Sequence, residues 1–378
     1  MSKQKITALE YIRGISMLGV VGIHTGAYSL SNPSVNVHLF ALLDIFTRFS
    51  VPIFFFVSAF GLFINHNIQS KLNYVTFTIR RSRTVLLPYI VWSLLYMVHY
   101  TFVSHDVSIW TAPLLYEFLC FGLASCQLYF LVILLWFYTL MPVWRFMVCR
   151  IIEHPLRDLG ILLLLQIIFN YYSSYVLKVD VSNHYLSKLL SYRLNYWVLH
   201  YLFIFLFGAV CAIKYAEFEQ LITRYQRHIK IFFYITLSGM LSFYYYLVYF
   251  NHYSPEQAVN TAHQLSPIGV LYTLATTLFL FMLFNQDKMP KIVKIILASL
   301  GKHSYLVYLV HPLIMYYLFY YLTVYNIVMS ARIVIVFYLL TITISLTFAI
   351  FTQKISRFLP VIGLLLAGSK LAKPKSGV

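Results

Sequence analysis

Three ionisable side chains, Glu10, Arg13 and His24, interrupt the first long apolar stretch of the chain. His24 follows Arg13 by eleven residues, which at about 100° per residue places both on one helix face, separated by about 16 Å along the axis. A histidine can act as a general base near neutral pH, and an arginine can bind an anion. Glu10, one turn before Arg13, is its natural partner. The alternatives are a hydrogen-bonded core histidine and an arginine that extends to the cytoplasmic headgroups.

The same stretch is rich in glycine, with Gly14, Gly19, Gly22 and Gly26. Residues without a side chain allow another helix, or a ligand, to approach the backbone closely. Helix packing would explain the glycines but not the ionisable residues. The combination therefore favours a functional site on this helix.

A second polar cluster, Arg80-Arg81-Ser82-Arg83, precedes a later apolar stretch. Arg80 and Arg83 are one helical turn apart, so their guanidinium groups can converge on one anion. Bidentate arginine suits phosphate, which makes phosphate binding one interpretation of the cluster. The other interpretation is simple anchoring, because basic clusters are common at the cytoplasmic ends of membrane helices.

A third candidate is His311, which precedes Pro312 in another apolar stretch. We expect His311 to reach the middle of the membrane, where Pro312 kinks the helix. Its two interpretations are a core histidine and a supporting residue of a catalytic site. Two carboxylates, Asp44 and Glu117, are further candidates to support His24, although neither belongs to a motif.

The four cysteines show no spacing typical of a metal site, and we predict no metal. Cys120 and Cys126 are six residues apart, which would place them on different faces of a helix. We interpret the cysteines as structural thiols, because free cysteine is commonly buried.

The composition identifies the elements that must hold these residues. Of the 378 residues, 61% are hydrophobic and 10% are charged, and the mean hydropathy is +0.77. Soluble domains carry roughly 25% charged residues, so this chain has too little polar surface for one soluble core. Its net charge of +17 comes from short clusters between apolar runs, not from a basic face that would bind nucleic acid. We predict an all-α, polytopic membrane helical bundle, and we exclude a disordered chain and a secreted disulfide scaffold.

A membrane-spanning helix needs about 20 apolar residues, and this criterion predicts about ten transmembrane helices. Their approximate ranges are 8–30, 45–65, 84–103, 128–147, 159–177, 195–213, 230–250, 266–285, 304–323 and 331–352. An even number of spans places both termini on the same side. Residues 104–127 are predicted to form an outer loop, either plain or with a short re-entrant or interfacial helix.

The distribution of Lys and Arg orients the bundle. If the N-terminus is cytoplasmic, 22 of the 28 basic residues fall in cytoplasmic segments and 5 in outer ones, with Arg13 inside the first span. This asymmetry predicts that both termini are cytoplasmic. We assign residues 1–357 to a transmembrane domain and residues 358–378 to a short basic cytoplasmic tail, which we expect to lie on anionic lipid.

Five motifs, in this order on a ten-span chain, resemble the membrane-bound acyltransferase-3 family over about residues 5–355. They are Arg13 with His24 in the first span, the run from Phe49 to Ser58, the RxxR turn of Arg80 and Arg83 followed by Pro88-Tyr89, the run Leu128-Tyr129-Phe130-Leu131, and the stretch from Ser304 to Pro312. Two positions depart from the family's pattern. Ala59 follows Ser58 where the family usually has glycine, and Gln127 stands where many members carry histidine. Because the second departure removes a titratable group, we assign no proton transfer to Gln127.

The resemblance implies transfer of an acyl group, most often acetyl from acetyl-CoA, to a hydroxyl of a cell-surface polysaccharide or its lipid-linked precursor. It implies a multi-pass protein of the plasma membrane with acyl-CoA as co-substrate and no permanently bound cofactor. His24 is then the expected catalytic base. The residues expected to bind the acyl donor are Arg13, Arg80 and Arg83, and those expected to support the site are Glu10, Asp44, Glu117 and His311.

Two other function classes stay open. A transporter or exporter of a polysaccharide or small metabolite would share a polar cavity but would not need to bind coenzyme A. A non-catalytic subunit of a glycan-assembly complex would need neither polar cluster for chemistry. The expected partners are acyl-CoA, the glycan and the lipid bilayer, with no nucleic acid. The sequence leaves open the acceptor glycan, the length of the acyl group and whether the chain forms a homodimer.

Overall fold

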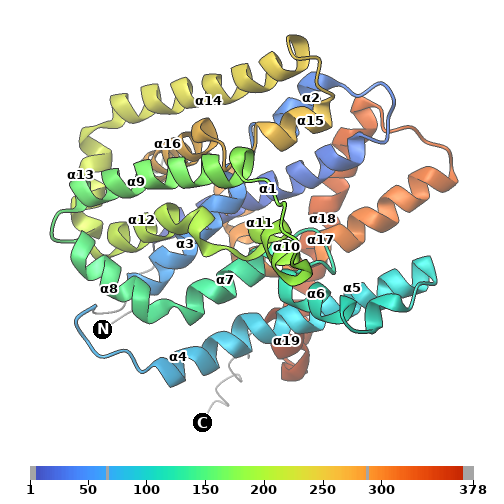
Figure 1. The fold of residues 1–378 in the computed structure, drawn as a ribbon, viewed down its shortest axis with the longest axis horizontal. Coiled ribbons are helices and arrows are strands. Elements are labelled where there is room, and N and C mark those ends of the chain that lie inside the picture. The colour runs from blue at the N-terminus through green and yellow to red at the C-terminus, as the bar shows by residue number, and fades with distance from the viewer. Residues whose placement is uncertain (1–5, 65–67, 287–288, 369–378) are drawn as a thin grey trace.

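The chain forms a bundle of helices in the computed structural model (Figure 1). The structure describes residues 6–64, 68–286 and 289–368, and these ranges contain no β-strand. The first half comprises α1 (Thr7–Ser29), α2 (Val37–Leu43), α3 (Ser50–Phe63), α4 (Tyr74–Arg81), η1 (Ser82–Leu86), α5 (Leu87–Ser104), η2 (Ser108–Trp110), α6 (Leu114–Phe121), α7 (Tyr129–Thr139), α8 (Met141–Ile151), α9 (Pro155–Tyr171) and η3 (Tyr172–Val176). The second half comprises α10 (His184–Ser191), α11 (Arg193–Tyr196), η4 (Val198–Tyr201), α12 (Leu202–Ile213), α13 (Tyr215–Arg224), α14 (Gln226–Tyr249), α15 (Pro255–Thr261), α16 (Pro267–Asn285), α17 (Lys291–Val324), α18 (Ala331–Ile355) and α19 (Pro360–Ala367).

Six helices in the described ranges are long and apolar enough to cross a membrane. They are the continuous helix α4–η1–α5, the continuous helix α9–η3, and α14, α16, α17 and α18. Two bent pairs, α7 with α8 and η4–α12 with α13, turn by 70° and 101° and raise the number to eight if each pair crosses once. The all-helical, multi-pass prediction is therefore confirmed, but the count of ten spans is not. The cytoplasmic location of both termini stays a prediction.

Two predicted spans account for the difference in the number of candidate spans. The span predicted over 45–65 contains α3, which has only 14 residues and is shorter than the roughly 20 residues that cross a bilayer. The span predicted over 8–30 is α1, whose 23 residues are long enough but which is not among the apolar candidates. Both helices are nevertheless largely buried within the bundle, where protein contacts replace lipid contacts.

Glycines bring α1 and α17 into close contact. A Cβ atom on Gly14 would lie 2.3 Å from the carbonyl oxygen of Leu297, and a Cβ atom on Gly301 would lie 1.9 Å from that of Glu10. Backbones can approach this closely only where no side chain intervenes. On α1, a Cβ atom on Gly19 would also lie 2.0 Å from the hydroxyl oxygen of Ser50 in α3. Of the two alternatives for the glycines of the first helix, another helix or a ligand, the structure shows another helix at Gly14 and Gly19.

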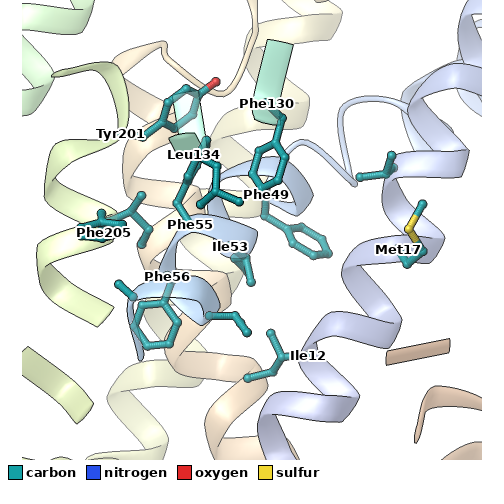
Figure 2. Packing of buried hydrophobic residues seen from close by; sticks show 14 of the residues in the cluster. Ile12, Met17, Phe49, Ile53, Phe55, Phe56, Phe130, Leu134, Tyr201 and Phe205 are labelled. Carbon is teal, nitrogen blue, oxygen red and sulfur yellow. The ribbon is translucent and has the colours of Figure 1, made fainter. Parts of the chain in front are cut away.

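Aromatic side chains fill the contact between α3, α7 and α12 (Figure 2). The rings of Phe137 and Phe205 stack with their centroids 4.1 Å apart, and the Phe55 ring lies 4.6 Å from that of Tyr201. Aromatic pairs of this kind contribute about 0.5–1.5 kcal/mol each beyond the burial of their area. This cluster holds α3 in place beside α1 and thereby supports one wall of the site described below.

The segment predicted as an outer loop contains the short helix α6, so the structure favours the short-helix alternative over a plain loop. The helix ends at Gly122, whose φ of 69° lies in the left-handed region. A Cβ atom there would lie 2.6 Å from the backbone nitrogen of Tyr129. Gly122 therefore permits the tight turn that leads the chain from α6 into α7.

The predicted cytoplasmic tail begins with a helix that packs on the bundle. α19 contacts α5 and η1 (Figure 1), and the indole nitrogen of Trp92 donates a hydrogen bond of 3.1 Å to the carbonyl of Leu366. The rest of the predicted tail, from residue 369 on, lies outside the described residues.

Candidate active site

Three side chains from distant parts of the sequence come together. His24 lies in α1, Cys126 lies between α6 and α7, and His311 lies in α17. The Cys126 sulfur is 3.6 Å from Nδ1 of His24, and the ring centroids of His24 and His311 are 5.2 Å apart. His311 is fully buried, His24 is partly exposed, and the Cys126 thiol is exposed. The structure thus brings the two predicted histidines together, and we refer to them as the histidine pair.

His311 offers an unused hydrogen-bond acceptor beside His24. Its Nδ1 lies 3.1 Å from the carbonyl oxygen of Val307, which can only accept, so we assign the ring proton to Nδ1. The neutral ring then has an acceptor at Nε2, and this buried atom has no partner among the described residues. A buried polar atom without a partner costs roughly 1–3 kcal/mol, so a hydrogen-bond donor brought by a ligand would relieve a real penalty.

Tyr308 ties the segment that contains Cys126 to α17. Its hydroxyl donates a hydrogen bond to the backbone carbonyl of Gln127, and its ring centroid lies 6.0 Å from that of His311. The Gln127 side chain accepts a hydrogen bond of 2.6 Å from the Ser125 hydroxyl. α17 therefore positions both His311 and the backbone beside Cys126, and it continues as one helix through Pro312.

A cavity of about 290 Å³ lies beside Tyr308, whose ring centroid is 6.0 Å from that of His311. Three cationic side chains line it, Arg13 from α1, Arg81 from α4 and Lys302 from α17, and we call it the cationic cavity. Phe130 and Tyr308 also line it, so the wall nearest the histidine pair contains the tyrosine that holds Gln127. The cavity can therefore accept an anionic ligand on the side of Arg13.

Of the three arginines in the cluster Arg80–Arg83, Arg81 lines this cavity. Arg80 and Arg83 are exposed. The Arg81 guanidinium carbon lies 4.9 Å from the ring centroid of Tyr138 and 5.3 Å from that of Phe77. Its Nε atom is buried and has no hydrogen-bond partner among the described residues. Because successive helical side chains are about 100° apart, the face shared by Arg80 and Arg83 cannot also carry Arg81.

A π-helical turn, η1, follows Arg81 directly. Such turns shift the phase of a helix by one residue and are frequent at functional sites. The predicted cluster therefore has two parts: Arg80 and Arg83 lie at the surface, and Arg81 faces the cavity.

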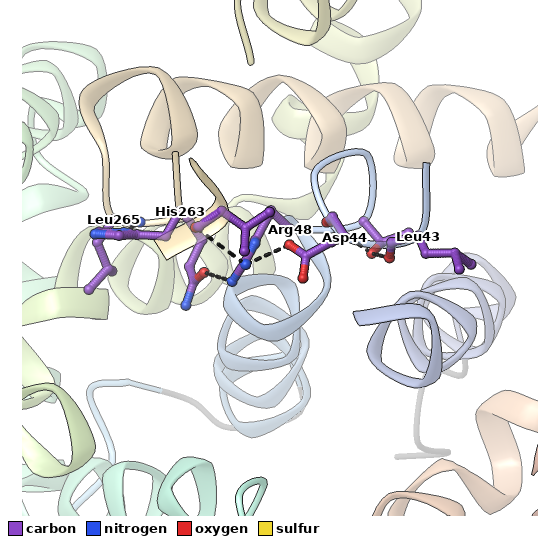
Figure 3. Close-up of polar contacts among 8 residues, drawn as sticks. Leu43, Asp44, Arg48, His263 and Leu265 are labelled. Atoms are coloured by element: carbon purple, nitrogen blue, oxygen red, sulfur yellow. Dashed lines mark hydrogen bonds and ion pairs between the residues drawn. The ribbon is translucent and has the colours of Figure 1, made fainter. Parts of the chain in front are cut away.

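Asp44 is the predicted carboxylate that lies near His24. It forms a buried ion pair of 2.5 Å with Arg48, which also contacts the Gln264 side chain at 3.3 Å (Figure 3). The Asp44 Cβ lies 3.7 Å from the place that a Cβ of Gly26 would occupy, so Asp44 packs against α1 two residues beyond His24. The carboxylate interacts electrostatically with His24 but makes no hydrogen bond to it in the described structure.

His263 lies near the same ion pair (Figure 3). Burial and the neighbouring charges of Arg48 and His200 lower the pKa of His263 to about 4. Its Nδ1 accepts a hydrogen bond of 3.0 Å from the backbone N–H of Leu265, as only a ring unprotonated at Nδ1 can do. His263 is therefore neutral at pH 7.

The two remaining predicted carboxylates lie elsewhere. Glu10 interacts electrostatically with Arg13, next to the cationic cavity. Glu117 forms an ion pair with Lys188 and lines a second cavity of about 530 Å³, together with Cys120 and several aromatic side chains. His24 does not line this second cavity, so Glu117 and His24 belong to different places in the fold.

Two residues of the site were not among the sequence-based candidates, Arg81 and Cys126. The expectation that the cysteines are buried is wrong for Cys126, because this residue is exposed, and its sulfur contacts a histidine 102 residues away in the sequence. Cys211, by contrast, is buried as expected. The available signal was the departure at Gln127, which placed an unusual residue directly after Cys126.

The comparisons with known proteins identify one family. The sequence profile of the acyltransferase-3 family, described as an acyltransferase domain, matches residues 6–351. The match covers nearly the whole chain, including the histidine pair and the cationic cavity. No curated protein and no solved structure matches the chain.

Proposed function

This chain belongs to the acyltransferase-3 family and is a membrane acyltransferase, and we propose that it transfers an acetyl group from acetyl-CoA to a hydroxyl of a cell-surface polysaccharide or its lipid-linked precursor. The observation that carries the proposal is the position of Tyr308, which lines the cationic cavity and whose ring centroid lies 6.0 Å from that of His311, the neighbour of the partly exposed His24. A base and an anion-binding cavity linked through Tyr308 suit a reaction between an anionic acyl donor and a neutral hydroxyl. We propose that the reaction takes place at the plasma membrane.

His24 is the general base in this proposal. A sugar hydroxyl is a poor nucleophile at neutral pH, and a neutral imidazole can take its proton as the oxygen attacks the acyl carbonyl carbon. General-base catalysis of this kind contributes roughly 10²–10⁴-fold to the rate. His311 positions the acceptor, because its unused Nε2 can accept a hydrogen bond from a second hydroxyl of the sugar while the reacting hydroxyl gives its proton to His24.

The cationic cavity holds the acyl donor. Arg13, Arg81 and Lys302 can bind the phosphates of coenzyme A, and the buried, unpartnered Nε of Arg81 fits an anionic ligand. The pantetheine arm then extends toward Tyr308 and Phe130 and brings the thioester close to the histidine pair. Arg80 and Arg83, exposed beside this cavity, attract the anionic donor but do not line its binding site.

Asp44 is a positioning residue in this scheme. Its carboxylate is near enough to stabilise the imidazolium that forms when His24 takes a proton. Arg48 offsets part of the Asp44 charge and holds the carboxylate in one place.

The decisive experiment compares His24→Ala with His154→Ala, a matched control at an exposed histidine outside the site. Each full-length protein is purified into lipid nanodiscs, and the release of free CoA from acetyl-CoA is measured by chromatography. In cells that produce each variant, acetylation of the surface glycan is measured by mass spectrometry. His24→Ala should lower acetyl transfer by roughly 10²–10⁴-fold, whereas the control should not.

Two results would contradict the proposal. If His24→Ala folds and acetylates the glycan at the wild-type rate, His24 is not the base. If the wild-type protein neither consumes acetyl-CoA nor changes glycan acetylation, the proposed reaction is wrong and a transport or assembly role is favoured instead.

A further inference from the structure

We propose that Cys126 carries the acyl group as a thioester between the acyl donor and the acceptor hydroxyl. This inference rests on the proposed acyltransferase function and adds a covalent step to it. It makes Cys126 a nucleophile and His24 the base that serves both halves of the reaction.

The contact between Cys126 and His24 has the geometry of an activated thiol. The sulfur lies 3.6 Å from Nδ1 of His24, within reach of an S–H···N hydrogen bond. A thiol becomes a strong nucleophile when an adjacent histidine takes its proton. Cys126 is also an exposed residue.

The other cysteines lack this arrangement. Cys211 is buried and Cys149 is half-buried, while Cys120 is exposed but lines the second cavity with the Glu117–Lys188 ion pair. Among the described residues, Cys126 is the cysteine with a hydrogen bond to a histidine.

The position of Cys126 fits a carrier that receives the acyl group from a donor in the cationic cavity. Tyr308 lines the cationic cavity and also holds the carbonyl of Gln127, the residue that follows Cys126. A residue that lines the acyl-donor cavity therefore holds the backbone next to Cys126. A thioester on Cys126 would let coenzyme A leave before the glycan hydroxyl reacts.

The empty acceptor on His311 supports a ligand at the same place. Its buried Nε2 has no partner among the described residues, and its ring lies 5.2 Å from that of His24. A second hydroxyl of the acceptor that donates a hydrogen bond to this nitrogen would hold the reacting hydroxyl next to the acyl group on Cys126.

The two steps balance in atoms and protons. In the first step, the Cys126 thiol gives its proton to His24 Nδ1, and its sulfur bonds to the acyl carbon. The bond from that carbon to the coenzyme A sulfur breaks, and the released coenzyme A thiolate takes the proton from His24. In the second step, the acceptor hydroxyl gives its proton to His24, and its oxygen bonds to the acyl carbon. The bond from that carbon to the Cys126 sulfur breaks, and the Cys126 thiolate takes the proton from His24. Exchange of one thioester for another needs no further reactant.

The test detects the acyl group on the protein. Full-length protein in nanodiscs is incubated with isotope-labelled acetyl-CoA without acceptor, quenched in acid, digested and analysed by mass spectrometry. We expect a labelled acetyl group on the Cys126 peptide that neutral hydroxylamine removes. Cys120→Ala, the matched exposed-thiol control, should keep the label, and His24→Ala should form it far more slowly.

A second measurement uses labelled coenzyme A. The wild-type protein should exchange it into acetyl-CoA without acceptor, and Cys126→Ala should lose both this exchange and glycan acetylation. If Cys126→Ala does not fold, Cys126→Ser takes its place. The proposal that Cys126 carries the acyl group is wrong if either variant acetylates the glycan at the wild-type rate. It is also wrong if the wild-type protein acetylates the glycan but shows neither the acetyl label nor the exchange of coenzyme A. A wild-type protein that transfers no acetyl at all overturns the proposed function and the Cys126 proposal together.

Discussion

Replacement of Arg81 by glutamine tests which arginine of the cluster binds the acyl donor. Arg81 lines the cationic cavity, whereas Arg80 and Arg83 are exposed. Arg81→Gln removes one cation from the cavity but keeps a polar, shorter side chain. Arg80→Gln and Arg83→Gln remove the same charge from neighbouring exposed positions and are therefore matched controls.

The expected magnitude follows from these surroundings. A hydrogen bond to a charged group contributes about 1.5–3 kcal/mol, and about 1.4 kcal/mol corresponds to a factor of ten in affinity. We expect Arg81→Gln to raise the KM for acetyl-CoA by about 10- to 100-fold, with little change in kcat because Arg81 does not touch the reacting carbonyl. Exposed charges contribute about 0–1 kcal/mol, so Arg80→Gln and Arg83→Gln should raise KM by about 5-fold at most.

The assay measures initial rates of CoA release against acetyl-CoA concentration at low and high salt. The small effects of Arg80→Gln and Arg83→Gln should shrink as salt screens exposed charges. Arg81→Gln should also lower the melting temperature slightly, because it removes the contacts with Phe77 and Tyr138. The reasoning fails if Arg81→Gln leaves KM unchanged while Arg80→Gln or Arg83→Gln raises it tenfold.

Two further predictions concern stability. Gly301→Ala forces a Cβ atom against the Glu10 carbonyl and should lower the free energy of unfolding by about 1–3 kcal/mol, measured by thermal unfolding in detergent. Gly160→Ala, in α9 with no atom within 4 Å of the added Cβ, is the control, and an equal loss there would contradict the packing argument. The folded protein lowers the pKa of His263 from 6.5 to about 4, so between these pH values the unfolded chain binds the proton more readily than the folded one. The free energy of unfolding should therefore fall as the pH falls from 6.5 to about 4. His263→Asn, which can still accept the Leu265 N–H, should weaken this pH dependence, and an unchanged profile would assign it to other groups.

Several features of the fold could be predicted from the sequence because they depend on local composition. Apolar runs of about 20 residues correspond to helices such as α14, α16 and α18. The glycines of α1 indicated close helix packing, which Gly14 and Gly19 provide. The number of spans could not be read in the same way, because α3 is apolar but has only 14 residues and is covered by protein. Hydropathy alone does not separate a short buried helix from a helix that crosses the bilayer.

The candidate site could be predicted only in part. His24 and Arg13 could be chosen by their residue types, and their shared helix face follows from their spacing within one helix. The choice between Arg81 and its neighbours depends on which helix face meets the cavity, which the RxxR spacing does not reveal. Cys126 resembled an ordinary thiol because its histidine partner lies 102 residues away.

The sequence by itself determined the class of protein, its helical elements and the side chains able to do chemistry, because hydropathy, charge and residue type act locally along the chain. The tertiary structure decided which of those side chains meet. Close packing of α1 on α17 places His24 beside His311, and the turn at Gly122 leads the chain toward the position of Cys126. Such contacts depend on how helix faces pack against each other, and no local pattern specifies which distant faces those are.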